Sequence, residues 1–158
     1  MTKEQHLQRL IRLYRQETGV SEWDMHDVAK WSERKGYRLP KPPTPLEMLA
    51  KELSRAARAE TKVDPYTGQK YRVNHAFTDG SGQMTLWVDI NEAPRKHMKK
   101  SAINRREQVV GDLVQLTLDL EYWNRKNPNE EPLEVPLDFT LDVEWRKNGG
   151  DAGESTAA

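Results

Sequence analysis

The sequence contains no cysteine and no long run of apolar residues, and each absence argues against a class of protein. Without cysteine the chain can form neither a disulfide framework nor a thiolate metal site. Without a long apolar run we expect no signal peptide and no membrane span, so the expected location is cytoplasmic. The histidines also lack the mutual spacing of metal ligands, and we expect no metal site. They are His6, His26, His75 and His97.

Motifs that mark the common enzyme classes are also missing. The chain has no phosphate-binding P-loop, no dinucleotide-binding glycine pattern and no nucleophile elbow. We therefore expect a protein without enzymatic activity and without a cofactor. Three carboxylates that alternate along the last apolar segment could in principle hold a divalent cation, but such a run is more often the solvated face of a sheet. These carboxylates belong to Asp138, Asp142 and Glu144.

The composition indicates a folded protein with a large polar surface. Apolar residues make up 35% of the 158 residues and charged residues 32%, while five tryptophans and five tyrosines argue against general disorder. The net charge is zero, but residues 1–106 carry 21 Lys and Arg against 13 Asp and Glu, whereas residues 107–158 carry 4 against 12. This polarity suits a nucleic-acid-binding front, and it suits equally a contact between the two parts or between two chains.

The segment 44–62 has the sharpest helix signals in the chain. Thr44 as the cap, Pro45 at the first helical position and Glu47 three residues after the cap predict where the helix begins. One face is apolar and is expected to contact a core through Leu46, Leu49, Ala50, Leu53 and Ala57. Another face is basic and consists of Lys51, Arg55, Arg58 and Lys62. This basic face is either a solvated helix surface or a DNA contact.

Two helices precede this segment and a β-hairpin follows it. Apolar residues at helical spacing predict a helix over residues 3–17, and a shorter one with a cap at Ser21 or Asp24 ends at Gly36. After turn residues at 64–68, alternating apolar residues predict strands at 70–77 and 83–89.

The aromatic residues of this hairpin allow two interpretations. Tyr71 and Phe77 share the face of Val73, which favours a place in the core. With Trp87 and Arg72 they could instead form a stacking platform for single-stranded nucleic acid. The core interpretation is preferred because large aromatic side chains are usually buried.

Helix, helix, capped basic helix and hairpin, in this order over residues 3–90, resemble the winged-helix variant of the helix-turn-helix. The resemblance implies that the helix at Thr44 reads the major groove, and that Arg72 with the loop 78–82 forms the wing. Two features depart from the family pattern: the linker 40–43 is rich in proline and longer than a tight turn, and the loop 78–82 has no cation. Because a fold does not determine a function, a winged helix that binds protein also remains open.

A long helical segment is predicted from Ala93-Pro94 to Asn127. It begins with the cations Arg95, Lys96, Lys99 and Lys100, which would oppose the helix dipole, so we expect a loop or a frayed start there. Together with Arg105 and Arg106, these cations would add phosphate contacts. Further along, apolar residues recur at spacings of four and three, at Val109, Leu113, Leu116, Leu120 and Trp123. This seam either packs against the first helix of the same chain or joins two chains.

Residues 133–145 alternate between apolar and mostly acidic side chains, which predicts a long strand with one acidic face. A single strand needs a partner, and either the 70–89 hairpin or another subunit would supply it. Pro136 favours an edge position. The polar tail 148–158 is expected to be disordered.

Together these features predict an α+β protein with a winged-helix-like domain at 1–92, a long helix plus strand at 93–147, and the tail. We expect it to bind duplex DNA as a small transcriptional regulator and to associate with itself or a protein partner through the C-terminal helix and strand. The expected DNA-contacting residues are Lys51, Arg55, Arg58, Lys62, Arg72, Arg95, Lys96, Lys99 and Lys100. The alternative is a non-enzymatic assembly subunit or adaptor, in a phage, defence or similar complex, that uses the same surfaces for protein contacts.

Overall fold

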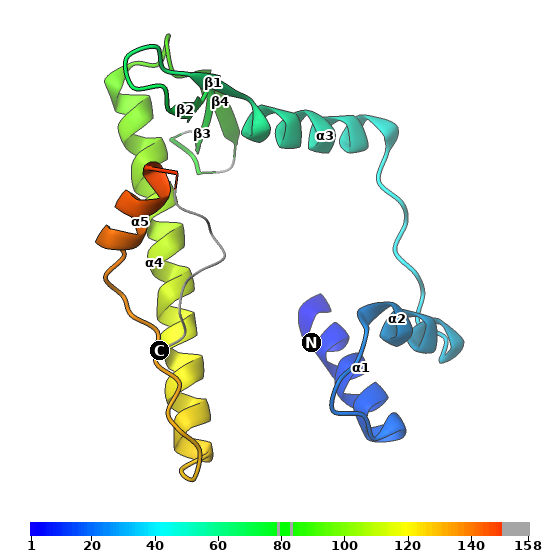
Figure 1. Ribbon diagram of the computed structural model, residues 1–158. Helices are drawn as coiled ribbons and strands as arrows, with labels where there is room; N and C mark the ends of the chain where they lie inside the picture. Colours follow the sequence, from blue (N-terminus) through cyan, green and yellow to red (C-terminus); the bar gives the residue numbers. More distant parts are fainter. Residues whose placement is uncertain (79, 83, 150–158) are drawn as a thin grey trace. The chain divides into compact units, whose positions relative to one another are not determined.

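The computed structural model describes residues 1–78, 80–82 and 84–149 of the chain (Figure 1). Over these residues it contains both helices and small antiparallel sheets, which confirms the expected α+β class. Contacts divide the chain into two compact units, Met1–Met48 and Leu49–Ala158. Each unit is described separately below.

The first unit contains helices α1 (Lys3–Thr18) and α2 (Met25–Arg34), close to the ranges predicted from the sequence. A capping box begins α1, in which Gln5 N donates to Thr2 Oγ1 at 3.2 Å and Thr2 N donates to Gln5 Oε1 at 2.8 Å. Gly19, with a φ of 71°, ends α1 in a left-handed conformation that glycine adopts without strain. Asp24 is the cap of α2, accepting from His26 N at 2.6 Å.

Packing between α1 and α2 forms the core of the first unit. Val28 and Trp31 of α2 are buried, and the ring of Tyr14 in α1 meets Trp31 edge-on with centroids 5.8 Å apart. Lys35 Nζ lies 2.9 Å from Glu17 Oε2 across the same contact. This hydrogen bond lowers the pKa of Glu17, and the Trp31 indole lowers it further, although among the described residues the Trp31 Nε1–H has no hydrogen-bond partner of good geometry.

Helix α3 (Pro45–Ala59) begins as predicted but ends earlier. Thr44 N donates to Glu47 Oε2 at 2.8 Å and Glu47 N donates to Thr44 Oγ1 at 3.2 Å, which completes the expected capping box. Because the helix ends at Ala59, Lys62 is not on its basic face and lies in the following strand.

The apolar face of α3 differs from the prediction. Leu46, Leu49 and Leu53 are 79%, 50% and 61% exposed, so this face does not contact a core within the described structure. The end of the helix is held instead by polar contacts from β3. Asn74 Nδ2 donates to Ala57 O at 3.2 Å and to Glu60 Oε2 at 2.7 Å.

Two antiparallel hairpins follow α3. Strand β1 (Thr61–Val63) pairs with β2 (Lys70–Arg72), and β3 (Asn74–Thr78) pairs with β4 (Thr85–Asp89). The single strand predicted over 70–77 is therefore divided at Val73, whose N–H donates to Glu60 O and whose carbonyl accepts from Ile90 N. Val73 is 3% exposed and Phe77 is 8% exposed, which confirms their predicted place in the core. Asp79, in the predicted wing loop, lies outside the described residues.

Helix α4 (Arg95–Lys126) begins in the basic cluster, so the loop or frayed start predicted for Arg95 to Lys100 is wrong. No acidic residue lies in its first turn and its N-cap, Pro94, makes no side-chain cap bond. Packing on the hairpin compensates for the unfavourable dipole. The ring of His97 stacks on Phe77 with centroids 4.3 Å apart, and Ser101 one turn later is 1% exposed.

The strand predicted over 133–145 is also wrong. Residues 131–139 form neither helix nor strand, and α5 (Thr140–Lys147) follows. The amide of Asn124 in α4 satisfies both backbone groups of Leu133, with hydrogen bonds of 2.9 Å to its N–H and its carbonyl, so this residue needs no neighbouring strand. Asp138 Oδ1 accepts from Thr140 N at 3.1 Å at the start of α5, and this bond lowers the pKa of Asp138.

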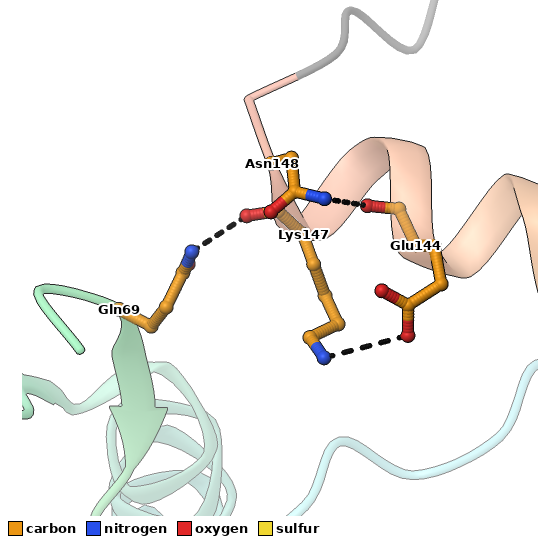
Figure 2. Close-up of polar contacts among 4 residues, drawn as sticks. All are labelled: Gln69, Glu144, Lys147 and Asn148. Atoms are coloured by element: carbon orange, nitrogen blue, oxygen red, sulfur yellow. Dashed lines mark hydrogen bonds and ion pairs between the residues drawn. The ribbon is translucent and has the colours of Figure 1, made fainter.

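The C-terminal segment returns alongside α4 (Figure 1). A hydrogen bond joins the end of α5 to the first hairpin. Gln69 Nε2 donates to the carbonyl oxygen of Lys147 at 2.7 Å, as Figure 2 shows. In the same view, Lys147 Nζ lies 3.5 Å from Glu144 Oε1, and Asn148 Nδ2 donates to Glu144 O at 2.9 Å. Of the predicted disordered tail, residues 150–158 lie outside the described part of the chain.

Candidate functional site

A cavity of about 380 Å³ lies where α3, the two hairpins and α4 of the second unit meet. Its walls come from four places: the end of α3, the end of β2, the β3–β4 hairpin and the second to fourth turns of α4. The lining contains no Asp or Glu among the described residues. This sets the cavity apart in a chain whose acidic and basic residues are equal in number.

Three arginines from three elements surround the cavity. Arg58 comes from the last turn of α3, Arg72 from the end of β2 and Arg105 from α4. Arg58 and Arg72 were predicted as nucleic-acid contacts, and Arg105 as an additional phosphate contact. None of the three forms an ion pair with a residue in the described ranges. Their guanidinium groups are therefore available to an anion that enters the cavity.

Trp87 forms an aromatic wall of the cavity beside Arg58. It lies opposite Ala76 in the hairpin, on the face of β4 that does not carry Leu86 and Val88. The guanidinium carbon of Arg58 lies 5.3 Å from the centre of its ring, within the range of a cation–π contact. The backbone carbonyl oxygen of Arg72, another arginine of the cavity, lies 2.9 Å from His75 Nε2. Because a carbonyl only accepts, this contact is a hydrogen bond donated by the Nε2–H of His75.

The α4 wall is a polar stripe made of Ser101, Asn104, Arg105 and Gln108. These residues follow one another at i, i+3, i+4 and i+7, which places them on one side of the helix. Ser101 is 1% exposed, and its Oγ has no hydrogen-bond partner among the described residues. A buried hydroxyl without a partner costs about 1–3 kcal/mol. The sequence analysis did not identify Ser101, Asn104 and Gln108, although their spacing was a visible signal.

The other predicted DNA-contacting residues lie outside this cavity. Lys51 and Arg55 are exposed on α3, and Lys62 is exposed in β1. Arg95, Lys96, Lys99 and Lys100 are exposed in the first two turns of α4. The structure thus brings together Arg58, Arg72 and Arg105 and leaves the remaining cations on the surface.

The predicted oligomerisation seam is only partly covered. Leu113 and Leu120 are half-buried, while Val109, Leu116 and Trp123 are 54%, 38% and 38% exposed. The C-terminal segment lies along part of this surface. Leu116 and Leu120 share one hollow with Leu133, Val135 and Leu137, and Leu113 shares another with Leu137.

Comparison with known proteins does not place the chain in a family. No known protein family, curated protein or solved structure matches it. Over the described residues there is no cluster of three or more His, Asp or Glu side chains that could hold a metal ion. In the same residues, no helix combines the length and the apolar character needed to cross a membrane.

Proposed function

We propose that this protein binds duplex DNA and acts as a small transcriptional regulator. One observation carries the proposal: Arg58, Arg72 and Arg105 converge on one cavity whose described lining has no carboxylate. Arginine presents a planar fork of donors that matches phosphate oxygens, and a cluster of arginines without counter-ions gives the electrostatic attraction on which DNA binding depends. The role is one of binding and not of catalysis.

In this proposal α3 reads the DNA, as the winged-helix resemblance implies. Lys51 lies two turns and Arg55 one turn before Arg58 on the same face of the helix, and both are exposed. The β3–β4 hairpin is the wing beside it. The exposed cations in the first turns of α4 supply further phosphate contacts.

The test measures how the affinity for mixed-sequence duplex DNA depends on salt, by fluorescence anisotropy. Each lost phosphate contact lowers the slope of log K against log salt concentration by about 0.9, so the triple variant R58A/R72A/R105A should lower it by roughly 2.7. The matched control removes three cations of the same unit that do not line the cavity, Arg125, Lys126 and Arg146. The control should retain the wild-type slope.

Two results would contradict DNA binding through this cluster. One is the absence of binding to duplex DNA at low salt. The other is a triple variant that binds with the same affinity and slope as the wild type, because the phosphate contacts would then lie elsewhere.

A second function, that of an assembly subunit or adaptor, is favoured by the apolar surface of the C-terminal part. Val114 and Leu118 of α4 are 54% and 53% exposed, and Leu141 of α5 is 83% exposed. Exposed apolar side chains that are close together mark protein-binding surfaces. Light scattering tests this: we expect a dimer at micromolar concentration and a monomer for V114D/L118D, whereas a wild-type monomer would refute self-association.

A further inference from the structure

The cavity is larger than a single phosphate group requires. Its volume of about 380 Å³ is at the lower end of the roughly 300–1,000 Å³ of small-molecule sites. A simple contact with the DNA backbone needs only a cationic surface, not a hollow of this size. The shape therefore calls for a ligand that has a body as well as an anionic group.

Ser101 is an independent sign that a ligand enters. Ser101 is 1% exposed, it lines the cavity, and its Oγ has no hydrogen-bond partner among the described residues. Buried polar groups in folded proteins nearly always have hydrogen-bond partners, so an isolated one in a cavity wall indicates a group that is supplied from outside. A serine hydroxyl can donate to a phosphate oxygen or accept from a base N–H.

Ser32 in the first unit is a buried helical serine that does not line this cavity and offers a comparison. It is 4% exposed and its Oγ donates to Val28 O, one turn earlier, at 2.8 Å. Ser101 has the corresponding carbonyl available at His97 but makes no hydrogen bond to it. The hydroxyl of Ser101, a residue of the cavity wall, thus has no hydrogen-bond partner within the described structure.

The remaining walls suit the two parts of a nucleotide. Arg72 and Arg105 provide cations, and the amides of Asn104 and Gln108 provide donors and acceptors that can pair with the edge of a base. Trp87 provides an indole ring of the kind on which unpaired bases stack.

We infer that the cavity binds one unpaired nucleotide, with its phosphate held by Arg72, Arg105 and the Ser101 hydroxyl and its base beside Trp87. The nucleotide is either part of a nucleic-acid strand or a free mononucleotide, and the chemistry of recognition is the same for both. As a nucleic-acid site, this inference rests on the proposed function. As a mononucleotide site, the inference does not depend on the proposed function.

The test uses the full chain and four probes: dAMP, inorganic phosphate, a short single-stranded oligonucleotide and a duplex. Titration calorimetry should show that dAMP and the oligonucleotide bind and compete with each other if both use the cavity. Ser101→Ala should weaken binding of both about 3- to 10-fold, the loss expected for one hydrogen bond to the ligand. Arg105→Ala should weaken it more than tenfold, and the control Ser32→Ala should leave it unchanged.

Protein stability separates a ligand-binding role of Ser101 from a structural one. Because its hydroxyl has no partner in the described structure, Ser101→Ala should keep or raise the resistance to unfolding while the affinity falls. Ser32→Ala should lower stability without changing the affinity. A Ser101→Ala variant that loses stability and affinity together would overturn the inference.

Other outcomes also decide the matter. Phosphate binding as tight as dAMP, no binding of dAMP or the oligonucleotide, or binding that is indifferent to Ser101→Ala and Arg105→Ala would each overturn the nucleotide site. If the duplex still bound with the expected salt slope, the proposed function would stand although the nucleotide site had been refuted. Binding of dAMP with no binding of the duplex would support the site and remove the proposed function.

Discussion

Replacing Phe77 with alanine should detach the β3–β4 hairpin from α4. Phe77 is 8% exposed, and its ring stacks on His97 at 4.3 Å with 17° between the planes. Removing a buried phenylalanine side chain costs about 3–5 kcal/mol. The stacked pair accounts for roughly 0.5–1.5 kcal/mol of this. Val73 is the other apolar residue buried to this degree in the described part of the second unit. Few other buried apolar contacts can therefore offset the loss of the Phe77 side chain.

Hydrogen exchange followed by mass spectrometry can measure this loss in each unit separately. A single unfolding curve is less suitable, because a chain with two compact units need not unfold in one step. A loss of about 3 kcal/mol corresponds to roughly 100-fold less protection. We expect this loss in peptides that cover β3, β4 and the first turns of α4, and no change in α1 and α2.

A matched control for this experiment is Leu141→Ala, because Leu141 is in the same unit and is 83% exposed. Its effect should stay within about 0.5 kcal/mol, as for most surface substitutions. Less than tenfold loss of protection in β3 and β4 of the Phe77→Ala variant would refute the packing argument. An equal loss in α1 and α2 would also refute it.

Three further predictions concern single side chains. The hydrogen bond from Lys35 lowers the pKa of Glu17 below 4.5, so the stability that Glu17 adds to the α1–α2 contact is present above pH 4.5 and is lost as the pH falls through the lowered value. Glu17→Gln should abolish this pH dependence of amide exchange in α1; a dependence that persists would exclude Glu17 as its source. Thr44→Ala should destabilise the first turn of α3 by about 1 kcal/mol, seen as faster amide exchange there, whereas Lys51→Ala should not. Gln69→Ala removes the hydrogen bond to Lys147 O and should increase exchange in α5 but not in β1; unchanged α5 exchange would mean that this bond does not hold the helix.

Helix starts could be predicted from the sequence where their signals are local. The capping box at Thr44 and Glu47 and the cap at Asp24 are formed by residues two or three positions apart, so no distant part of the chain affects them. The end of α1 at Gly19 is equally local. The turn before β2 was predicted for the same reason, since Asp64 Oδ1 accepts from Tyr66 N within the turn.

Two predictions that depended on a distant partner were wrong. The alternation over 133–145 fits a strand, but a strand needs an edge to pair with, and Asn124 takes the backbone groups of Leu133 instead. The basic start of α4 is unfavourable by local rules, but packing on the hairpin, including the contact between His97 and Phe77, stabilises a helix there. Neither partner can be identified from spacing alone.

The candidate site depends on the same contact that anchors α4. With 3.6 residues per turn, His97, Ser101 and Arg105 are four residues apart and lie on one side of the helix. The stacking of His97 on Phe77 therefore sets which side of α4 faces the hairpin, and so brings Ser101 and Arg105 to the cavity. The dependence runs in one direction: loss of the Phe77 side chain should disorganise the site, whereas loss of the exposed Arg105 side chain should leave the packing intact. Arg58 and Arg72 could be singled out from the sequence as cations, but their convergence with Arg105 follows from how this one aromatic pair orients the helix.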